Sequence, residues 1–365
     1  DNPTKWLSTS VNMLVNHTWG NRTSDNPYSQ GGLRTMIEQV PFLPVSLNGE
    51  YMQNNMIRTT AILKDKNDPS RGYQGFQPEG VGNPVEIFKR VESMSYNTQI
   101  FGNAALTFHL LKGLDLKTQV GVDYHNGRSQ GYTPFKPHQI IDMSANGSAS
   151  ASNSSSLYWQ EETYLTYIKD FDKHHLNAMA GASWQARKYT YFGASDSKFM
   201  DDYYGFYNLG AGTEKPSVGS DYDKWAMNSY FLRLAYNYNN TYMATVTGRY
   251  DGSSKFGENN KYAFFPSVGL GWLASNEKFL ENNKTISKLK LHTSFGMTGN
   301  SEIGTYRSIA TMSQGTTILN GSMVTVSYLD KMPNANLKWE KTAQFDLGFE
   351  LGLFNNRLNF DVSWY

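Results

Sequence analysis

The sequence contains no cysteine, so neither disulfide bonds nor thiolate metal sites are available to the protein. Charged residues make up 18% of the 365 positions, below the roughly 25% of an average soluble protein. No apolar run reaches the about 18 residues that a membrane-spanning helix requires. The net charge is +1 without a strongly basic block, which argues against nucleic-acid binding. If the chain crosses a membrane, it must cross with strands.

Aromatic residues are abundant at 14%, and many lie in segments where apolar and polar side chains alternate. In residues 344–353 every second side chain is Phe or Leu, and the positions between them are Gln, Asp, Gly and Glu. The alternation resumes at 358–364 after the short sequence FNN, which predicts a β-hairpin. Similar hairpins are predicted within 95–126, 157–191 and 225–251, and a further strand pair near 262–274 and 288–299.

The predicted connections between strands alternate between short and long. The short ones are LLKG, FDKHH, NYNNT and FNN. The long ones, rich in Ser, Asn, Gly and Tyr, are 21–94, 127–156, 192–224 and 300–338, with 251–261 as a compact exception. This asymmetry is typical of a transmembrane β-barrel, which has tight periplasmic turns and long extracellular loops.

The two faces of the predicted strands differ in the way that a barrel wall requires. The lipid-facing set includes Leu232, Leu234, Val246, Val268, Leu270, Trp272, Leu289 and Leu291, and the lumen-facing set includes Arg233, Asn237, Lys290, His292 and Ser294. Aromatic residues near strand ends are predicted to lie at the headgroup boundary: Tyr158, Trp159, Tyr189, Tyr191, Tyr236, Tyr238, Tyr242, Tyr250 and Trp339.

We count roughly eleven strands in this pattern, whereas bacterial single-chain barrels have an even number. The first residues show no signal peptide, and the chain stops within an alternating run. We therefore expect residues 1–365 to form part of an all-β, antiparallel up-and-down transmembrane barrel of about 22 strands. We expect the N-terminal plug and the C-terminal strands to be absent from this sequence.

Several segments, in one order, resemble the SusC/RagA family of TonB-dependent outer-membrane transporters. The most specific is RYDGSSKFGENNKYAFFPSVGLGWLASNEKF at 249–279, followed by LKLHTSFGMTGNSEIGTY at 289–306 and PNANLKWEKTAQFDLGFELGLFNNRLNFDVSWY at 333–365. NPVEIF at 83–88 and the segment from Pro41 to Tyr51 are similar but less specific. We assign structural roles to the motif residues Arg249, Asp251, Gly252, Ser253, Ser254, Phe256, Gly257, Phe265, Pro266, Ser267, Trp272, Gly299, Asn300, Trp339 and Glu340.

The resemblance implies active import of large nutrients across the outer membrane of a Gram-negative bacterium. In that family a SusD-like surface lipoprotein closes over the barrel, and the TonB–ExbB–ExbD complex supplies energy through the plug segment. The cargo would be an oligosaccharide, another glycan or a peptide. The resemblance implies contact with outer-membrane lipid, no cofactor, no nucleic acid and no enzymatic activity.

Substrate capture would fall to loops and to the upper lumen, where aromatic rings stack on sugars and polar groups bond to hydroxyls. The segment DDYYGFYNLG at 201–210 is the first candidate, and its aromatic residues are Tyr203, Tyr204, Phe206 and Tyr207. Packing between loops, or contact with the lipoprotein, is the favoured alternative for this segment. The lumen charges Arg233, Arg249, Asp346 and Glu350 are the second candidate group, and mutual pairing along the wall is favoured over contact with substrate or plug.

Three motifs suggest other chemistry, and each fails on its context. GRSQG at 127–131 matches the G-x-S-x-G nucleophile pattern, but prolines follow it where the hydrolase fold needs a helix. His174 and His175 fall in a predicted tight turn without further metal ligands. DGSSKFGENN lacks the spacing of a calcium loop and has Lys255 at a ligand position. We therefore predict no metal site and no catalytic residues.

Two other functions remain open from the residues alone. A passive porin or translocation pore would share the barrel but would need no plug. A soluble carbohydrate-binding β-protein or glycosidase would instead place two carboxylates in a cleft, without lipid-facing and lumen-facing sides.

Overall fold

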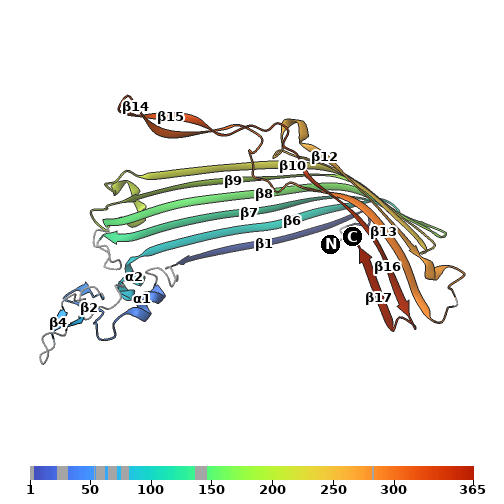
Figure 1. Ribbon diagram of the computed structural model, residues 1–365, viewed down its shortest axis with the longest axis horizontal. Coiled ribbons are helices and arrows are strands. Elements are labelled where there is room, and N and C mark those ends of the chain that lie inside the picture. The colour runs from blue at the N-terminus through green and yellow to red at the C-terminus, as the bar shows by residue number, and fades with distance from the viewer. Residues whose placement is uncertain are drawn as a thin grey trace.

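The computed structural model describes residues 4–22, 32–52, 54, 62–64, 72–74, 82–135, 146–281 and 283–365. Its main element is an antiparallel sheet of eleven strands in the order β1-β6-β7-β8-β9-β10-β11-β12-β13-β16-β17 (Figure 1). The bounds are β1 (Leu7–Asn21), β6 (Glu92–Leu111), β7 (Leu114–Phe135), β8 (Asn146–Phe171), β9 (His174–Ser197), β10 (Ser217–Tyr238), β11 (Tyr242–Ser253), β12 (Tyr262–Leu273), β13 (Ile286–Asn300), β16 (Glu340–Leu353) and β17 (Leu358–Trp364). The predicted up-and-down antiparallel fold is confirmed, and within the described residues the sheet is open, with β1 and β17 as its edges.

Tight turns join the strands at one end of the sheet. Gly113, between β6 and β7, has a φ of +78°, and a Cβ there would lie 2.0 Å from the carbonyl oxygen of Ile168. Asn239 and Asn240, between β10 and β11, both have a φ of 52°, the geometry that two-residue hairpin turns favour. At this end only the connection from β12 to β13, which contains the 3₁₀ turn η5 (Ala274–Asn276), is longer.

Two connections at the other end are shorter than the sequence predicts, because the strands continue into them. β7 extends to Phe135 and β8 begins at Asn146, so the predicted loop at 127–156 is mostly strand. β9 and β10 likewise extend into the predicted loop at 192–224, and the pairing of β8 with β9 continues to Ser148 and Ser197. These extensions are rich in Ser and Gly, and their few large apolar residues, such as Tyr132, Phe135 and Val218, do not form the regular apolar alternation that would mark a strand.

Small elements occupy the other two long connections. The first contains α1 (Gly32–Glu38), α2 (Pro84–Arg90) and the short strands β2 (Ser46–Leu47), β3 (Glu50–Tyr51), β4 (Ile62–Lys64) and β5 (Gly72–Gln74). In Figure 1 these elements lie together at the end of the sheet opposite the tight turns. The second contains the hairpin of β14 (Thr311–Leu319) and β15 (Ser322–Lys331), a separate two-stranded sheet. None of the described helices has the length and apolar character needed to cross a bilayer.

The NPVEIF segment is the start of α2. The Asn83 side chain accepts hydrogen bonds from the backbone amides of Val85 (3.0 Å) and Glu86 (3.2 Å), which caps the helix. Pro84 occupies the first turn, where its missing N–H costs nothing. The Asn83 amide also donates to the carbonyl oxygen of Val45 at 2.9 Å, so one side chain ties the helix to the segment before it.

The strand register separates the side chains into an outward and an inward face, as the sequence predicts. Leu234, Val246, Val268, Phe295 and Phe345 are consecutive partners across five strands, so all lie on the outward face. Their exposed fractions reach 49% at Val246 and 47% at Phe345, so this apolar face is not packed inside the molecule. The register places the predicted lipid-facing residues on this one face.

The inward face is polar along the same rows. Arg233, Thr247, Ser267, Gly296 and Gln344 are consecutive partners, one position away from the apolar row. A wall with hydrocarbon-compatible side chains outside and hydrogen-bonding side chains inside is the arrangement of a transmembrane barrel.

Two clusters of buried apolar side chains lie near the end with long connections. The first contains Tyr132, Ala149, Phe199 and Phe206. The second, the inward corner cluster, contains Phe256, Ala263, Phe265 and Trp339. In the inward corner cluster, the Trp339 ring lies 4.6 Å from the Phe256 ring and 5.4 Å from the Phe265 ring.

The prediction that Trp339 lies at the membrane boundary is wrong, because its side chain is only 6% exposed. Its indole N–H donates to the carbonyl oxygen of Lys261 at 3.0 Å, and its ring folds over the inward face of β12. Tyr158 is likewise on the inward face, where its hydroxyl lies 2.7 Å from Gln185 Oε1. The sequence pattern cannot separate these aromatic residues from boundary residues, because both kinds occur near strand ends.

We expect Trp339→Ala to lower the free energy of unfolding by about 3–5 kcal/mol, the range for removing a large buried aromatic side chain. Trp339→Phe, which keeps the ring stack but loses the hydrogen bond to Lys261, is expected to cost about 1 kcal/mol. Urea unfolding of the protein in lipid vesicles measures both losses. Equal and small losses for the two variants would contradict the packing role of Trp339.

Candidate functional site

The inward face carries the four candidate charges Arg233, Arg249, Asp346 and Glu350, and the surroundings of their side chains differ. Glu350 lies opposite Lys290 in the register of β13 and β16. Its carboxylate accepts hydrogen bonds from Lys290 Nζ at 2.8 Å and from Lys288 Nζ at 2.5 Å. The charge of Glu350 is therefore matched within the wall, as the pairing alternative expects.

Arg249 is held in a second network. Its Nε donates to Asp251 Oδ1 at 2.7 Å, and its Nη2 donates to the hydroxyl of Ser229 at 2.8 Å. The guanidinium carbon lies 5.8 Å from the centre of the Phe231 ring. Because Ser229 is fully buried and Asp251 is 7% exposed, this network braces β10 against β11.

Asp346 and Arg233 differ in whether their side chains have hydrogen-bond partners within the wall. Asp346 accepts hydrogen bonds from the Ser294 hydroxyl at 3.2 Å and from the Gln344 amide at 3.0 Å. Arg233 is exposed, and within the described residues its guanidinium has no ion pair or hydrogen-bond partner. Of the four charges, Arg233 is the one that is open to a ligand in the lumen.

An aromatic and cationic group lies higher on the inward face, toward the long connections. The Tyr158 and Trp225 rings are 6.1 Å apart, and Lys255 Nζ lies 5.3 Å from the centre of the Trp225 ring. A hollow of about 210 Å³ is lined by Trp225, Lys255, Thr305 and Tyr306, together with residues of β10 and Ser254. We call Tyr158, Trp225 and Lys255 the upper-lumen group.

Sequence reasoning does not identify the upper-lumen group. Tyr158 and Trp159 are adjacent, so one of them must face inward, and the alternation alone contains this signal. Lys255 lies on a loop, so its position over the Trp225 ring depends on the loop conformation, which the sequence pattern does not show. Aromatic planes beside amide and ammonium groups can bind sugars or peptide side chains.

The loop candidate lies elsewhere. Phe206 is buried against Tyr132, Ala149 and Phe199, whereas Tyr203 and Tyr207 are 85% and 83% exposed and Tyr204 is 51% exposed. Tyr132 and Ala149 are partners in the register and share a face with Trp159. This is the outward face, so the structure does not bring the loop tyrosines together with Arg233 and the other inward charges.

The motif residues have structural contacts. A Cβ at Gly257 would lie 2.1 Å from the carbonyl oxygen of Ala335, and one at Gly299 would lie 2.1 Å from the Phe265 ring. The amide of Asn300 donates to Glu340 Oε2 at 3.0 Å. These contacts, together with the inward corner cluster, join the 249–267 segment to the 333–340 segment.

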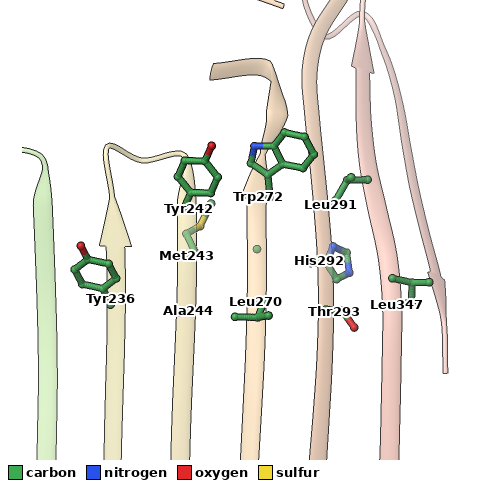
Figure 2. A pocket seen from close by; sticks show the side chains of 11 residues that line it. Tyr236, Tyr242, Met243, Ala244, Leu270, Trp272, Leu291, His292, Thr293 and Leu347 are labelled. Carbon is green, nitrogen blue, oxygen red and sulfur yellow. The ribbon is translucent and has the colours of Figure 1, made fainter. Parts of the chain in front are cut away.

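Aromatic rings and leucine side chains line a hollow on the outward face next to the tight turns (Figure 2). It has a volume of about 450 Å³, and Figure 2 shows Tyr236, Tyr242 and Trp272 on neighbouring strands β10, β11 and β12. The Tyr242 hydroxyl donates to Glu277 Oε1 at 2.5 Å, and the Trp272 indole N–H donates to the same oxygen at 3.3 Å. Apolar rings with polar tips toward the turns are typical of residues at a membrane boundary.

The described part of the chain holds no group of His, Asp and Glu side chains suited to a metal ion. His174 Nδ1 lies 2.6 Å from the Tyr236 hydroxyl, and His175 pairs with Asp170. The GRSQG motif lies within β7 rather than in a loop, and the strand continues to Phe135 where a nucleophile elbow would turn into a helix.

Several known proteins are similar in sequence to this chain over most of its length. TonB-dependent receptor P26 of Formosa agariphila is 29% identical over 324 residues, which are 87% of this chain and 32% of that protein. TonB-dependent receptor P3 of the same organism is 33% identical over 264 residues, 72% of this chain and 26% of that protein. TonB-dependent receptor SusC of Bacteroides thetaiotaomicron is 26% identical, covering 94% of this chain and 34% of SusC. The chain thus spans about a third of the length of these relatives or less.

The solved structure of the RagAB peptide transporter matches 99% of this chain and 38% of its own chain, with 25% identity and a TM-score of 0.73. These likenesses confirm the resemblance to the SusC/RagA type that the motifs indicate. The family model described as TonB dependent receptor-like, beta-barrel, matches residues 1–365. Proteins of this family are transporters of the outer membrane rather than enzymes. The chain belongs to the β-barrel family of TonB-dependent receptors.

Proposed function

We propose that this chain forms part of the barrel wall of an active importer in the outer membrane of a Gram-negative bacterium. The observation that carries the proposal is the two-faced wall, in which the apolar row through Leu234 and Phe345 is exposed while its polar neighbours face inward. The polar inward face suits a lumen through which large polar nutrients pass. Membership of the TonB-dependent receptor family supports energy-dependent rather than passive transport.

Active import requires more than a wall. A barrel of about 22 strands has a lumen too wide for its own side chains to fill, so a plug must close it. We propose that a plug segment connects the barrel to the TonB–ExbB–ExbD complex, which supplies the energy for release. A SusD-like lipoprotein would cover the mouth, in line with the similarity to SusC and to the RagAB transporter.

The cargo, we propose, is an oligosaccharide or a peptide that contacts the upper-lumen group and Arg233. Tyr158 and Trp225 offer aromatic planes, and the Tyr158 hydroxyl lies within hydrogen-bond distance of both Gln160 (2.9 Å) and Gln185 (2.7 Å). Lys255 and the unpaired Arg233 add positive charge for carboxylates or hydroxyls. The exposed loop tyrosines Tyr203, Tyr204 and Tyr207 remain candidates for contact with the lipoprotein or with cargo outside the lumen.

Energy dependence separates active import from a passive pore. In cells that express the full-length protein, deleting tonB or dissipating the proton gradient is expected to reduce cargo uptake to background, because captured cargo is no longer released. Uptake of labelled oligosaccharides and peptides measures the effect and identifies the cargo class. Uptake that continues unchanged after both treatments would support the passive pore, and a protein that extracts into buffer without detergent would rule out the barrel.

Trp225→Leu is expected to weaken cargo binding about tenfold, or about 1.4 kcal/mol, because it removes the aromatic plane of the upper-lumen group. The matched control is Tyr230→Leu, on the same strand but on the outward face, where the ring is 48% exposed. Isothermal titration of the purified full-length protein with cargo compares the two. Equal affinities for Trp225→Leu and Tyr230→Leu would remove Trp225 from the cargo site.

A further inference from the structure

A cleft of about 310 Å³ lies on the outward face, toward the end with the long connections. Trp159 on β8 and Trp184 on β9 border one side, and Tyr262 on β12 borders the other. These rings are 39%, 41% and 46% exposed, so they present their faces to the surroundings of the wall. Ala226 and Gly252 line the cleft between them and leave its floor shallow.

Packing fixes the shape of this cleft, which we call the outer-wall cleft. The Tyr262 ring stacks on Tyr250 with centroids 5.1 Å apart and an interplanar angle of 15°. A Cβ at Gly252 would lie 2.2 Å from the Tyr262 ring, so the ring rests directly on the glycine. Asn228, the partner of both Trp184 and Gly252 in the register, adds an amide to the lining. Hydrogen-bonding capacity and aromatic planes therefore lie side by side.

Three lysines surround the outer-wall cleft. Lys261 lines it, and Lys188 lies directly opposite Lys224 one step beyond the Ala186–Ala226 pair on the same face. Like charges directly opposite on neighbouring strands destabilise a sheet. Within the part of the chain that the structure describes, none of the three makes an ion pair, although Lys188 Nζ lies 5.9 Å from the centre of the Tyr222 ring.

The nearest carboxylates along these strands do not neutralise the lysines. Asp223 lies next to Lys224 in sequence but on the inward face, where it bonds to Thr305. Glu161, the partner of Trp184, is on the outward face but accepts a hydrogen bond from Thr118 at 3.2 Å, on the side of the cleft toward the tight turns. The positive charge above the outer-wall cleft is therefore left for an external anion.

The chemistry of the outward face changes in steps along the strands. On the side of the tight turns, Leu165, Ala180 and Leu232 form an apolar row, which the row through Thr163, Ala182 and Tyr230 separates from the cleft. The aromatic cleft follows, and the Lys188–Lys224 pair lies beyond it. This order matches an amphiphile with acyl chains at one end, a sugar ring in the middle and phosphates at the other end.

We infer that the outer-wall cleft binds a phosphorylated glycolipid of the outer leaflet, with a headgroup of the lipid A kind. Its phosphates would pair with Lys188, Lys224 and Lys261, and its glucosamine ring would lie against Trp159 and Trp184. The inference rests on the proposed function only in placing the wall in the outer membrane, with the long connections at the cell surface.

The test compares two matched lysine pairs in the full-length protein, each changed to glutamine. Lys188→Gln with Lys224→Gln removes the unpaired charges beside the cleft, and Lys112→Gln with Lys173→Gln removes two exposed lysines of the tight turns. After reconstitution in nanodiscs that contain bisphosphorylated lipid A, native mass spectrometry measures the lipid retained per protein. Retention is expected to fall about 25-fold for the first pair, since each of the two lysines near a charged lipid surface contributes about a factor of five, and to stay unchanged for the second.

Two further arms identify the ligand. Lipid A without phosphates is expected to be retained by the unmodified protein at least as weakly as bisphosphorylated lipid A is by the Lys188→Gln, Lys224→Gln protein, which still has Lys261. Millimolar inorganic phosphate is expected not to displace the lipid, because it lacks the sugar ring and acyl chains. Equal retention by the two lysine pairs, equal retention with and without lipid phosphates, or displacement by phosphate alone would each overturn the inference.

Cargo uptake, measured in cells that carry the same variants, distinguishes a failure of the lipid-site inference from a failure of the proposed import function. Loss of lipid retention with normal uptake supports the inference and leaves the importer proposal intact. If the unmodified protein shows no energy-dependent uptake but retains phosphorylated lipid A through Lys188 and Lys224, the importer proposal fails and the lipid site stands.

Discussion

The backbone of this chain can lie in lipid only if the strand ladder satisfies its N–H and C=O groups, and the rest of the structure depends on this constraint. The eleven-stranded sheet meets the requirement by pairing nearly every strand with the strands before and after it in sequence. Once the ladder is fixed, alternation sends successive side chains to opposite faces. The apolar row through Val246 and Val268 and the polar row through Thr247 and Ser267 are two consequences of the same register.

Charged residues on the two faces of the sheet differ in ion pairing. Inside, Glu350 meets Lys288 and Lys290, and Arg249 meets Asp251, so most of the charge serves to brace neighbouring strands. Outside, Lys188 and Lys224 lie opposite each other, and among the described residues neither forms an ion pair with a carboxylate. The paired charges brace the sheet, whereas the two outward lysines are the charges on which the proposed lipid site rests.

The sequence predicts the hairpins, their approximate turns and the two faces, because each of these depends on residues close together in the chain. It misplaces the ends of β7, β8, β9 and β10, whose outer parts are rich in Ser and Gly and lack regular apolar alternation. Trp339 is assigned to the membrane boundary because the residues that bury it, Phe256 and Phe265, are more than seventy positions away in the sequence. The candidate charges could be chosen from the sequence but not sorted into the paired Arg249 and the open Arg233, because pairing depends on the side-chain conformation and on the register between β10 and β11.

The inward corner cluster also bears on how the molecule assembles. The hydrogen bond from Trp339 to Lys261 joins residues 78 positions apart, and Gly257 docks on the segment that precedes β16. Contacts so distant in sequence form slowly, because a long stretch of chain must be ordered before they contribute. Neighbouring hairpins can therefore zip together first, and the contact between the 249–267 and 333–340 segments closes last, after β12, β13 and β16 are aligned. The inward corner cluster can therefore form only when these strands are correctly paired, and its formation marks the end of sheet assembly.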